Sequence, residues 1–205
     1  MQKKEWATRT KHDRADSTTR AVLLTAARRV FEHSGYARTT VARITEEAGV
    51  GRATFYVYFS SKEEVFSVLA EQVKDSFLAS QELNGVDADD PYAVAEATIT
   101  AFLDAYTEHL EFITVLRHQT LSDPGMGALW EEIHALPRHR SAHYTQRLVD
   151  QGMADPAASP EAVAQAAGGM IAAFAGQLAA APEDRDRVAR ELTAMYVRLL
   201  GLARP

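Results

Sequence analysis

Residues 39–66 read TTVARITEEAGVGRATFYVYFSSKEEVF, and this stretch decides how the N-terminal part of the chain folds. In its first segment, 40–47, Val41 and Ile44 recur at the spacing of one helix face, and a glycine closes the segment. A second segment, 52–58, begins after a glycine-containing turn of about three residues. Two short helices joined in this way predict a helix-turn-helix, a motif whose second helix enters the major groove of DNA.

Four aromatic rings near the end of this stretch divide between two sides of the second helix. At about 100° per residue, Phe55 and Phe59 fall within about 40° of each other, and we expect both to point inward. Tyr56 lies on the opposite side and Tyr58 on a flank, so both offer hydroxyls near the surface. A compact helical hairpin without DNA binding would explain the two phenylalanines equally well, but it does not need the surface tyrosines.

Charge is unevenly distributed along the chain. The whole chain carries a net charge of −6, yet residues 1–62 contain 12 Lys and Arg against 6 Asp and Glu. A basic first third on an acidic body predicts that the N-terminal part meets a polyanion. The alternative is a chance asymmetry between solvated faces.

Composition excludes several classes of protein. The absence of cysteine excludes disulfides, thiolate metal sites and a cysteine nucleophile, and it fits a cytoplasmic protein. Residues 1–20 lack the apolar segment of a secretory signal. Residues 163–181 are uncharged, but they are mostly Ala and Gly, which favours tight helix packing over insertion into a membrane. We therefore expect no membrane association.

The periodicity predicts an all-α protein, with no sustained strand alternation. Residues 1–16 are polar and are expected to form a flexible basic arm. Helices are expected at about 17–34, 40–47, 52–58, 61–82, 91–108, 110–121, 125–150, 160–180 and 183–202.

The segment 17–70 resembles the DNA-binding domain of the tetracycline-repressor (TetR) family of transcription regulators. The resemblance rests on the "TTV…I…EAGV" helix, the "T-F-Y-x-YF" recognition helix and the "SKEE" opening of the next helix. It implies an N-terminal three-helix DNA-binding domain at 17–63, with its motif at 40–59. It also implies a C-terminal helical ligand-binding and dimerisation domain at 64–205.

Both the residue chemistry and the resemblance assign DNA contacts. Hydroxyls and a lysine suited to phosphates stand at Thr40, Thr54, Tyr56, Tyr58 and Lys62. Side chains expected near bases are Arg52, Ala53 and Val57, since Arg binds guanine in bidentate fashion and small apolar groups contact the thymine methyl. The resemblance places Arg43 at the edge of the groove.

The chain departs from the family pattern at several positions. Many members have Ser where Gly51 stands, which predicts a weaker cap for the recognition helix here. Many have Arg at Ala42 and Ala at Thr45, which changes the phosphate contacts of the first helix. The arm at 1–16 either reaches the DNA backbone or minor groove or acts as a solubilising tail.

The last two helices are expected to form a homodimer interface, which the resemblance also implies. Spacing of 4-3-4-3 residues predicts a seam of Val188, Leu192, Met195, Leu199 and Leu202. The preceding helix offers one side formed by Val163, Ala167, Met170, Phe174 and Leu178, and a row of small residues formed by Gly168, Ala172 and Gly176. The alternative is that both helices pack within the chain's own core.

The resemblance implies a small-molecule pocket in the C-terminal domain but not the identity of its ligand. Pockets need mostly apolar walls with a few polar groups. Candidate residues are Phe102, Tyr106, Phe112, Leu116, Trp130, Ile133 and His134, with Gln177 as a polar partner. Each of them is equally compatible with plain core packing.

No motif supports catalysis or a cofactor. The sequence has no GxSxG, Walker A, GxGxxG or HExxH pattern, so we expect a non-enzyme with no metal and no cofactor. His139 and His143 share a helix face, but we expect solvated side chains there. The sequence therefore predicts a homodimeric, ligand-responsive repressor that binds a near-palindromic operator in double-stranded DNA. The alternatives are an activator, or a helical small-molecule-binding or catalytic protein without DNA binding.

Overall fold

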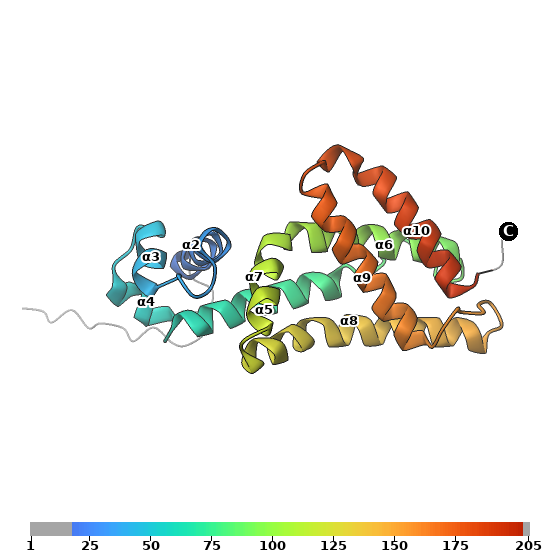
Figure 1. Cartoon of the computed structure of the whole chain (residues 1–205), viewed down its shortest axis with the longest axis horizontal. Helices are drawn as coiled ribbons and strands as arrows, with labels where there is room; N and C mark the ends of the chain where they lie inside the picture. The colour runs from blue at the N-terminus through green and yellow to red at the C-terminus, as the bar shows by residue number, and fades with distance from the viewer. Residues whose placement is uncertain (1–17, 203–205) are drawn as a thin grey trace, which may run out of the picture. The chain divides into compact units, whose positions relative to one another are not determined.

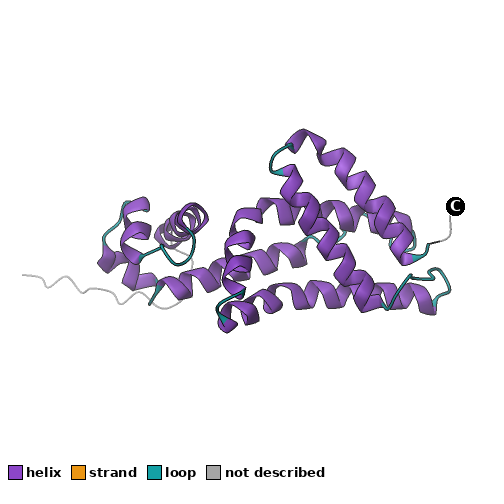
Figure 2. Ribbon diagram, viewed as in Figure 1, coloured by secondary structure: helices purple, strands orange, loops and turns teal. Residues whose placement is uncertain are grey.

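The computed structural model describes residues 18–202 of the 205-residue chain (Figure 1). The predicted arm at 1–16 lies outside the described residues. The chain divides into a first unit, Met1–Ala70, and a second unit, Glu71–Pro205. Within residues 18–202 every regular element is a helix, which confirms the all-α prediction (Figure 2).

The first unit contains three helices and the beginning of a fourth. They are α2 (Thr18–Ser34), α3 (Val41–Glu47), α4 (Arg52–Tyr58) and the first half of α5 (Lys62–Ala79). Phe31 and Phe66 form the centre of its core, with ring centroids 4.9 Å apart and planes at 78°. Gly35 follows the last residue of α2 and has a φ of 74°. This left-handed backbone ends the helix within the sequence HSGY (33–36).

Capping side chains fix the beginning of α5. The hydroxyl of Ser61 accepts a hydrogen bond from the Glu64 amide at 3.2 Å, which is one of the two bonds of a capping box. The Glu64 carboxylate, however, accepts from the amide and hydroxyl of Ser60, at 2.6 and 2.7 Å. The start of α5 is thus held by two consecutive serines rather than by one.

The second unit consists of the rest of α5 and five further α-helices with one short 3-10 helix. These are α6 (Pro91–Glu108), α7 (Leu110–Thr120), α8 (Pro124–Asp150), α9 (Pro160–Leu178), η1 (Pro182–Asp184) and α10 (Arg185–Leu200). α9 packs against α8 and α6, and α10 packs against α6 and α9 (Figure 1). In this part of the chain no helix combines the length and apolarity needed to cross a membrane.

Three of these helices begin with the same sequence device. Asp90, Asp123 and Ser159 each accept hydrogen bonds from backbone amides of the first turn, and each precedes a proline at the first helical position. Proline suits that position because its missing N–H would have no partner in the helix. Local chemistry alone therefore sets where α6, α8 and α9 start.

The end of α10 is tied to the loop between α8 and α9. Gly201 has a φ of 65°, and its carbonyl accepts a hydrogen bond from the Asp155 amide at 3.2 Å. A Cβ at Gly201 would overlap the backbone of Asp155. Only glycine fits here, both for the left-handed backbone and for the close approach of the loop.

The observed helices differ from the expected ones only near their ends. α5 ends at Ala79 rather than near residue 82, and the last helix begins at Arg185 because residues 182–184 form η1. The two units meet within α5, after Ala70. The domain limit predicted at residue 63 stays a prediction.

Candidate functional site

The inner side of α4 holds the recognition helix in its unit. Phe55 is fully buried and Phe59 nearly so, with ring centroids 5.8 Å apart. The Arg20 guanidinium lies 5.2 Å from the centroid of the Phe59 ring, which is within the range of a cation–π contact. The two phenylalanines therefore anchor α4, as their spacing predicted.

The outer side of α4 faces solvent. Tyr56 is 58% exposed and Val57 is 47% exposed, and Arg52 and Ala53 are exposed too. Within residues 18–202, Arg52 has no hydrogen bond or ion pair. An arginine, a tyrosine and a large apolar side chain thus share one exposed face of a short helix, where the Tyr56 ring lies edge to face with that of Phe55, with centroids 5.4 Å apart, and the Tyr56 hydroxyl stays accessible.

The beginning of α4 lacks a side-chain cap. Gly51 occupies the cap position and has no side chain to accept a hydrogen bond from the first turn, which confirms the weaker cap that the sequence indicated. α3, by contrast, is capped by the hydroxyl of Thr40, which accepts from the Arg43 amide at 3.3 Å. Thr40 and Arg43 are both exposed.

Other residues near this surface are less exposed to solvent. Thr54 and Tyr58 are half-buried on the flanks of α4. Thr45 is buried, and its hydroxyl donates to the Ala42 carbonyl at 3.0 Å, so it presents nothing to a partner. The roles in DNA binding assigned to this surface stay predictions.

Lys62 has an internal role that the sequence did not indicate. Its ammonium donates to the carbonyl oxygens of Tyr36 and Thr39, both at 3.0 Å, and lies 4.6 Å from the centroid of the Tyr36 ring. An ammonium has three N–H donors, so these bonds engage two of them. Lys62 therefore joins α5 to the turn before α3, and its phosphate contact stays a prediction.

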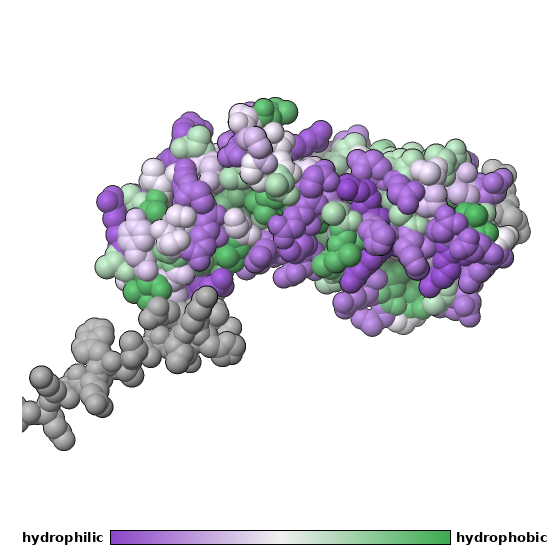
Figure 3. All heavy atoms as spheres, turned by 90° about the horizontal axis from the view of Figure 1, so that it is seen from below, coloured by the Kyte–Doolittle hydropathy of each residue, from purple (hydrophilic) through white to green (hydrophobic). Residues whose placement is uncertain are grey.

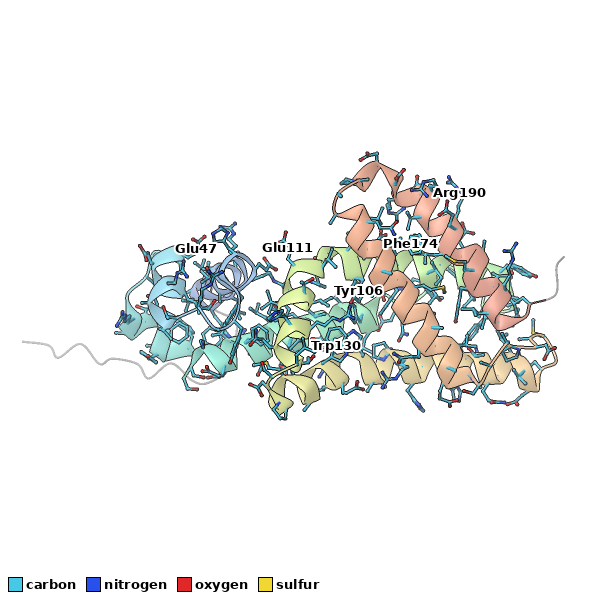
Figure 4. All side chains as sticks on the ribbon, viewed as in Figure 1. Glu47, Tyr106, Glu111, Trp130, Phe174 and Arg190 are labelled. Carbon is cyan, nitrogen blue, oxygen red and sulfur yellow. The ribbon has the colours of Figure 1, made fainter. Side chains whose placement is uncertain are left out.

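The second unit contains a cavity of about 810 Å³ between α6, α7, α8, α9 and α10, which is open to solvent on one side. One face of α8 supplies Trp130, His134 and Ser141, and α6 supplies Phe102 and Tyr106. Figure 4 marks Tyr106 and Trp130 in the interior of this unit. The volume lies within the range of small-molecule sites, which is roughly 300–1,000 Å³.

Small residues of α9 leave room for the cavity. Gly168, Gly169 and Ala172 line it, and a Cβ at either glycine would meet nothing within 4 Å. The sequence assigned Gly168 and Ala172 to a row for close helix contact. In the folded chain they instead line the cavity, and their small size leaves it wider.

The predicted pocket residues separate into two groups. Those that line the cavity are Phe102, Tyr106, Trp130 and His134. Phe112, Leu116 and Ile133 lie almost fully buried in the core and do not line the cavity, and Gln177 is exposed on α9 outside the lining, so their role in ligand binding stays a prediction. Periodicity identifies a buried face, but it does not separate core from cavity wall.

Sequence reasoning missed several polar residues of the cavity. Arg117 of α7 and the ion pair of Arg138 with Glu131, at 3.0 Å, line it, as do Ser141 and Tyr196, whose hydroxyl oxygens are 3.4 Å apart. Helical spacing gives no signal for Arg117, because it lies among polar residues at the end of α7.

Burial sets the protonation of His134. Its Nδ1 lies 2.8 Å from the Trp130 carbonyl oxygen, which only accepts, so Nδ1 carries the proton and Nε2 is the acceptor in the neutral ring. Burial lowers the pKa of His134, and this outweighs the opposing effect of the hydrogen bond. The ring is therefore neutral near pH 7 and stacks at 4.2 Å on Trp130.

Several residues predicted for the dimer interface lie in the core of this chain. Val163, Ala167, Val188, Leu192 and Leu202 are all buried, as is Leu178 at the end of α9. They fill the space where α9 and α10 pack on each other and on their neighbours, so they offer no surface to a second copy. Their burial argues against an interface role, which stays a prediction. Met170, Phe174, Gly176, Met195 and Leu199 are partly or fully exposed, and their interface role stays a prediction.

The exposed side of α9 is a stripe of small residues. It follows 4-3-4-3 spacing and consists of Ala162, Ala166, Gly169, Ala173 and Gly176, of which Gly169 and Ala173 also line the open side of the cavity. Figure 4 labels Phe174 on the same helix and Arg190, which is exposed, on α10. The face seen from below the view of Figure 1 carries hydrophilic and hydrophobic residues interspersed (Figure 3).

Comparisons with known proteins match the first unit most strongly. The sequence model described as "Bacterial regulatory proteins, tetR family" matches residues 23–69. The chain is 36% identical over 90 residues to the uncharacterized HTH-type transcriptional regulator YfiR of Bacillus subtilis, covering 44% of this chain and 42% of that protein. It is 30% identical over 103 residues to the HTH-type transcriptional repressor NicS of Pseudomonas putida, covering 50% and 49%. The chain thus spans about half the length of the curated relatives it matches.

Solved structures match nearly the whole fold. The crystal structure of a putative TetR-family transcriptional regulator from Rhodococcus sp. has a TM-score of 0.76 at 13% identity, covering 90% of this chain and 100% of that one. A bacterial regulatory protein of the tetR family from Rhodococcus RHA1 has a TM-score of 0.74 at 20% identity, covering 92% and 100%. At these identities the likeness shows the fold of both units.

Proposed function

We propose that the chain, whose residues 23–69 match the model of the tetR family of bacterial regulatory proteins, is a transcription regulator that binds operator DNA as a homodimer and releases it when a small molecule fills the cavity. Repression is the proposed direction, since the relative from Pseudomonas putida is named a repressor. A DNA-binding protein that responds to a ligand needs a DNA surface, a dimer contact and a coupled pocket. Each of these has support in the chain.

The outer side of α4 is the observation that carries the proposal. Arg52, Tyr56 and Val57 are exposed there, although covering the apolar surface of the Val57 side chain and of the Tyr56 ring would be favourable in water. Arg52 suits guanine and Val57 suits the thymine methyl, while the Tyr56 hydroxyl suits a phosphate. Such a side chain set on the second helix of a helix-turn-helix supports reading of the major groove.

The surface of α9 supports the dimer. Its outward stripe of Ala and Gly permits a second helix to approach closely, and Met170 and Phe174 flank the stripe as partly exposed apolar side chains. A symmetric dimer places two recognition helices about one DNA turn apart, roughly 34–36 Å, on a near-palindromic operator.

The course of α5 supports coupling between ligand and DNA. This helix contributes Phe66 to the core of the first unit and Phe77 to that of the second. The Phe77 ring lies 4.7 Å from Phe102 and 5.7 Å from Tyr106, both of which line the cavity. A ligand that moves those rings moves α5. To shift binding, it must favour the state that does not bind DNA, typically by about 1–3 kcal/mol.

The test is a gel-shift titration of the full chain on the DNA upstream of its own coding sequence. We expect a single shifted species that a DNA of unrelated sequence competes away only weakly, and that requires two copies of the chain. A chain that binds both DNAs equally, or neither, would instead favour a helical small-molecule-binding or catalytic protein.

A further inference from the structure

The lining of the cavity has a charge imbalance. Its charged side chains among the described residues are Arg117, Glu131 and Arg138. Arg138 is paired with Glu131 and also donates to Gln165, whereas the exposed side chain of Arg117 has no hydrogen bond or ion pair within residues 18–202. A net positive cavity in a part of the chain that is otherwise strongly acidic points to an anion as its occupant.

A tyrosine that lines the cavity keeps its hydroxyl free of hydrogen bonds within the described part of the chain. Tyr106 as a whole is only 4% exposed, and no described residue forms a hydrogen bond with its hydroxyl. The hydroxyl oxygen is not among the fully buried polar atoms that lack a partner, so it stays accessible to a partner that the chain does not supply. Arg117 is close enough to lower the pKa of Tyr106, against the larger effect of burial, which raises it. A guanidinium and a hydroxyl donor therefore serve the same part of the cavity.

The rest of the lining defines the body of the ligand. Trp130, His134 and Phe102 supply ring surfaces, and the lining face of α8 runs from Trp130 to Ser141. The eleven residue-to-residue steps from Trp130 to Ser141 correspond to a rise of about 16 Å along the helix axis. Arg117 lies one turn before the end of α7, and α8 begins a few residues later. Arg117 is therefore closer to Trp130 than to Ser141 along the lining face of α8.

We propose that the effector is an elongated organic acid, with its carboxylate bound by the Arg117 guanidinium and the Tyr106 hydroxyl and its apolar, ring-bearing body lying along α8. This inference rests on the proposed function, which assigns the cavity to an effector. Arginine binds a carboxylate through two parallel N–H donors, and such charge-assisted bonds are about twice as strong as neutral ones. The neutral His134 ring adds stacking surface without adding charge.

The experiment uses the full chain carrying Trp6→Phe, which leaves Trp130 as its only tryptophan. Quenching of Trp130 fluorescence reports binding of phenylalkanoic acids, from phenylacetate to phenyloctanoate, and of the primary amide of each. We expect the longer acids to bind about tenfold more tightly than their amides, which corresponds to about 1.4 kcal/mol.

Variants separate the carboxylate contact from general effects. Arg117→Gln should weaken the acids about tenfold and leave the amides unchanged, and Tyr106→Phe should weaken the acids less. Arg140→Gln is the matched control, because Arg140 is exposed on α8 and does not line the cavity. Gly168→Leu should abolish binding of acids and amides alike by filling the cavity, while Gly127→Leu on α8 should not.

The inference is overturned if no acid of the series binds, if the amides bind as tightly as the acids, or if Arg117→Gln weakens both equally. Gel shifts on the same protein keep the two proposals apart. A chain that shifts DNA but binds no acid refutes the organic acid and leaves the regulator in place. A chain that binds the acids but no DNA refutes the transcription regulator and leaves the organic-acid site in place.

Discussion

The side-chain ammonium of Lys62 lies 3.0 Å from the backbone carbonyl oxygen of Thr39, so the first residue of α5 is tied to the turn that precedes α3. Thr39 is itself buried, and its hydroxyl donates to the Gly35 carbonyl at 2.8 Å. The helix-turn-helix is therefore oriented by a charge-assisted contact from outside its own two helices.

This contact predicts a stability effect for Lys62→Met, which keeps most of the apolar stem and removes the donors. Hydrogen bonds to charged groups contribute about 1.5–3 kcal/mol, so we expect a loss within that range in urea unfolding. Arg52→Met is the control, because the exposed Arg52 side chain has no hydrogen bond or ion pair among the described residues. The salt dependence of DNA binding reports separately on the predicted phosphate contact, whose loss lowers the slope by about one. A variant as stable as the wild type would contradict the structural role.

Tyr56→Phe should weaken DNA binding by about 1 kcal/mol and leave the melting temperature nearly unchanged, because the exposed hydroxyl serves no contact of the fold. Phe55→Ala, one position earlier, should instead cost about 3–5 kcal/mol of stability. Anisotropy titrations with operator DNA and thermal unfolding measure the two effects. Unchanged DNA affinity of Tyr56→Phe would remove that tyrosine from the interface.

Arg52→Ala should cost about 1–3 kcal/mol of binding to the operator and relax discrimination at one base pair. Stability should stay the same, since Arg52 has no hydrogen bond or ion pair among the described residues. Binding to a panel of operators that each carry one substituted base pair measures the change. Equal losses on every sequence would indicate a phosphate contact in place of base reading.

His134 should make the second unit sensitive to acid. Burial lowers its pKa below the value of about 6.5 in the unfolded chain, so the unfolded chain binds more protons as the pH falls through that value. The stability linked to His134 is present above about pH 6.5 and is lost below it. His134→Phe keeps the ring and should lose less stability than the wild type between pH 7 and pH 5.

Urea unfolding across this pH range provides the measurement. His139→Gln, at an exposed position on the same helix, is the control and should follow the wild type. The same pH profile in His134→Phe and the wild type would show that His134 is accessible to protons in the folded chain.

Gly201→Ala should destabilise the second unit. A left-handed backbone costs a residue with a Cβ roughly 1–3 kcal/mol, and the overlap with Asp155 adds to this. Gly127→Ala, in a helix with open space around it, should be neutral or stabilising. Equal melting temperatures of the two variants would argue against the close approach of the α8–α9 loop to the end of α10.

Much of the helical pattern was predictable because its causes are local. Asp90 and Pro91 at the start of α6, or Gly35 at the end of α2, act on backbone groups within one turn of themselves. Phe55 is buried and Tyr56 is exposed because successive residues of a helix are turned by about 100° from each other, which is also a local cause.

The candidate sites were only partly predictable. Phe112 and Trp130 are both aromatic residues with an inward side, yet only Trp130 lines the cavity. Lys62 resembles a phosphate ligand in sequence, and its hydrogen bonds reach residues more than 20 positions away. Such contacts have no periodicity to reveal them.

The sequence by itself determined the helices, their caps and the identity of the recognition helix, since these depend on neighbours along the chain. Only the tertiary structure decided which side of α9 faces the cavity, because Ala and Gly fit a core, a cavity wall or a surface at little difference in free energy. It also decided that Arg117 reaches the cavity from α7, since a cavity is the space left between helices that are distant in the sequence.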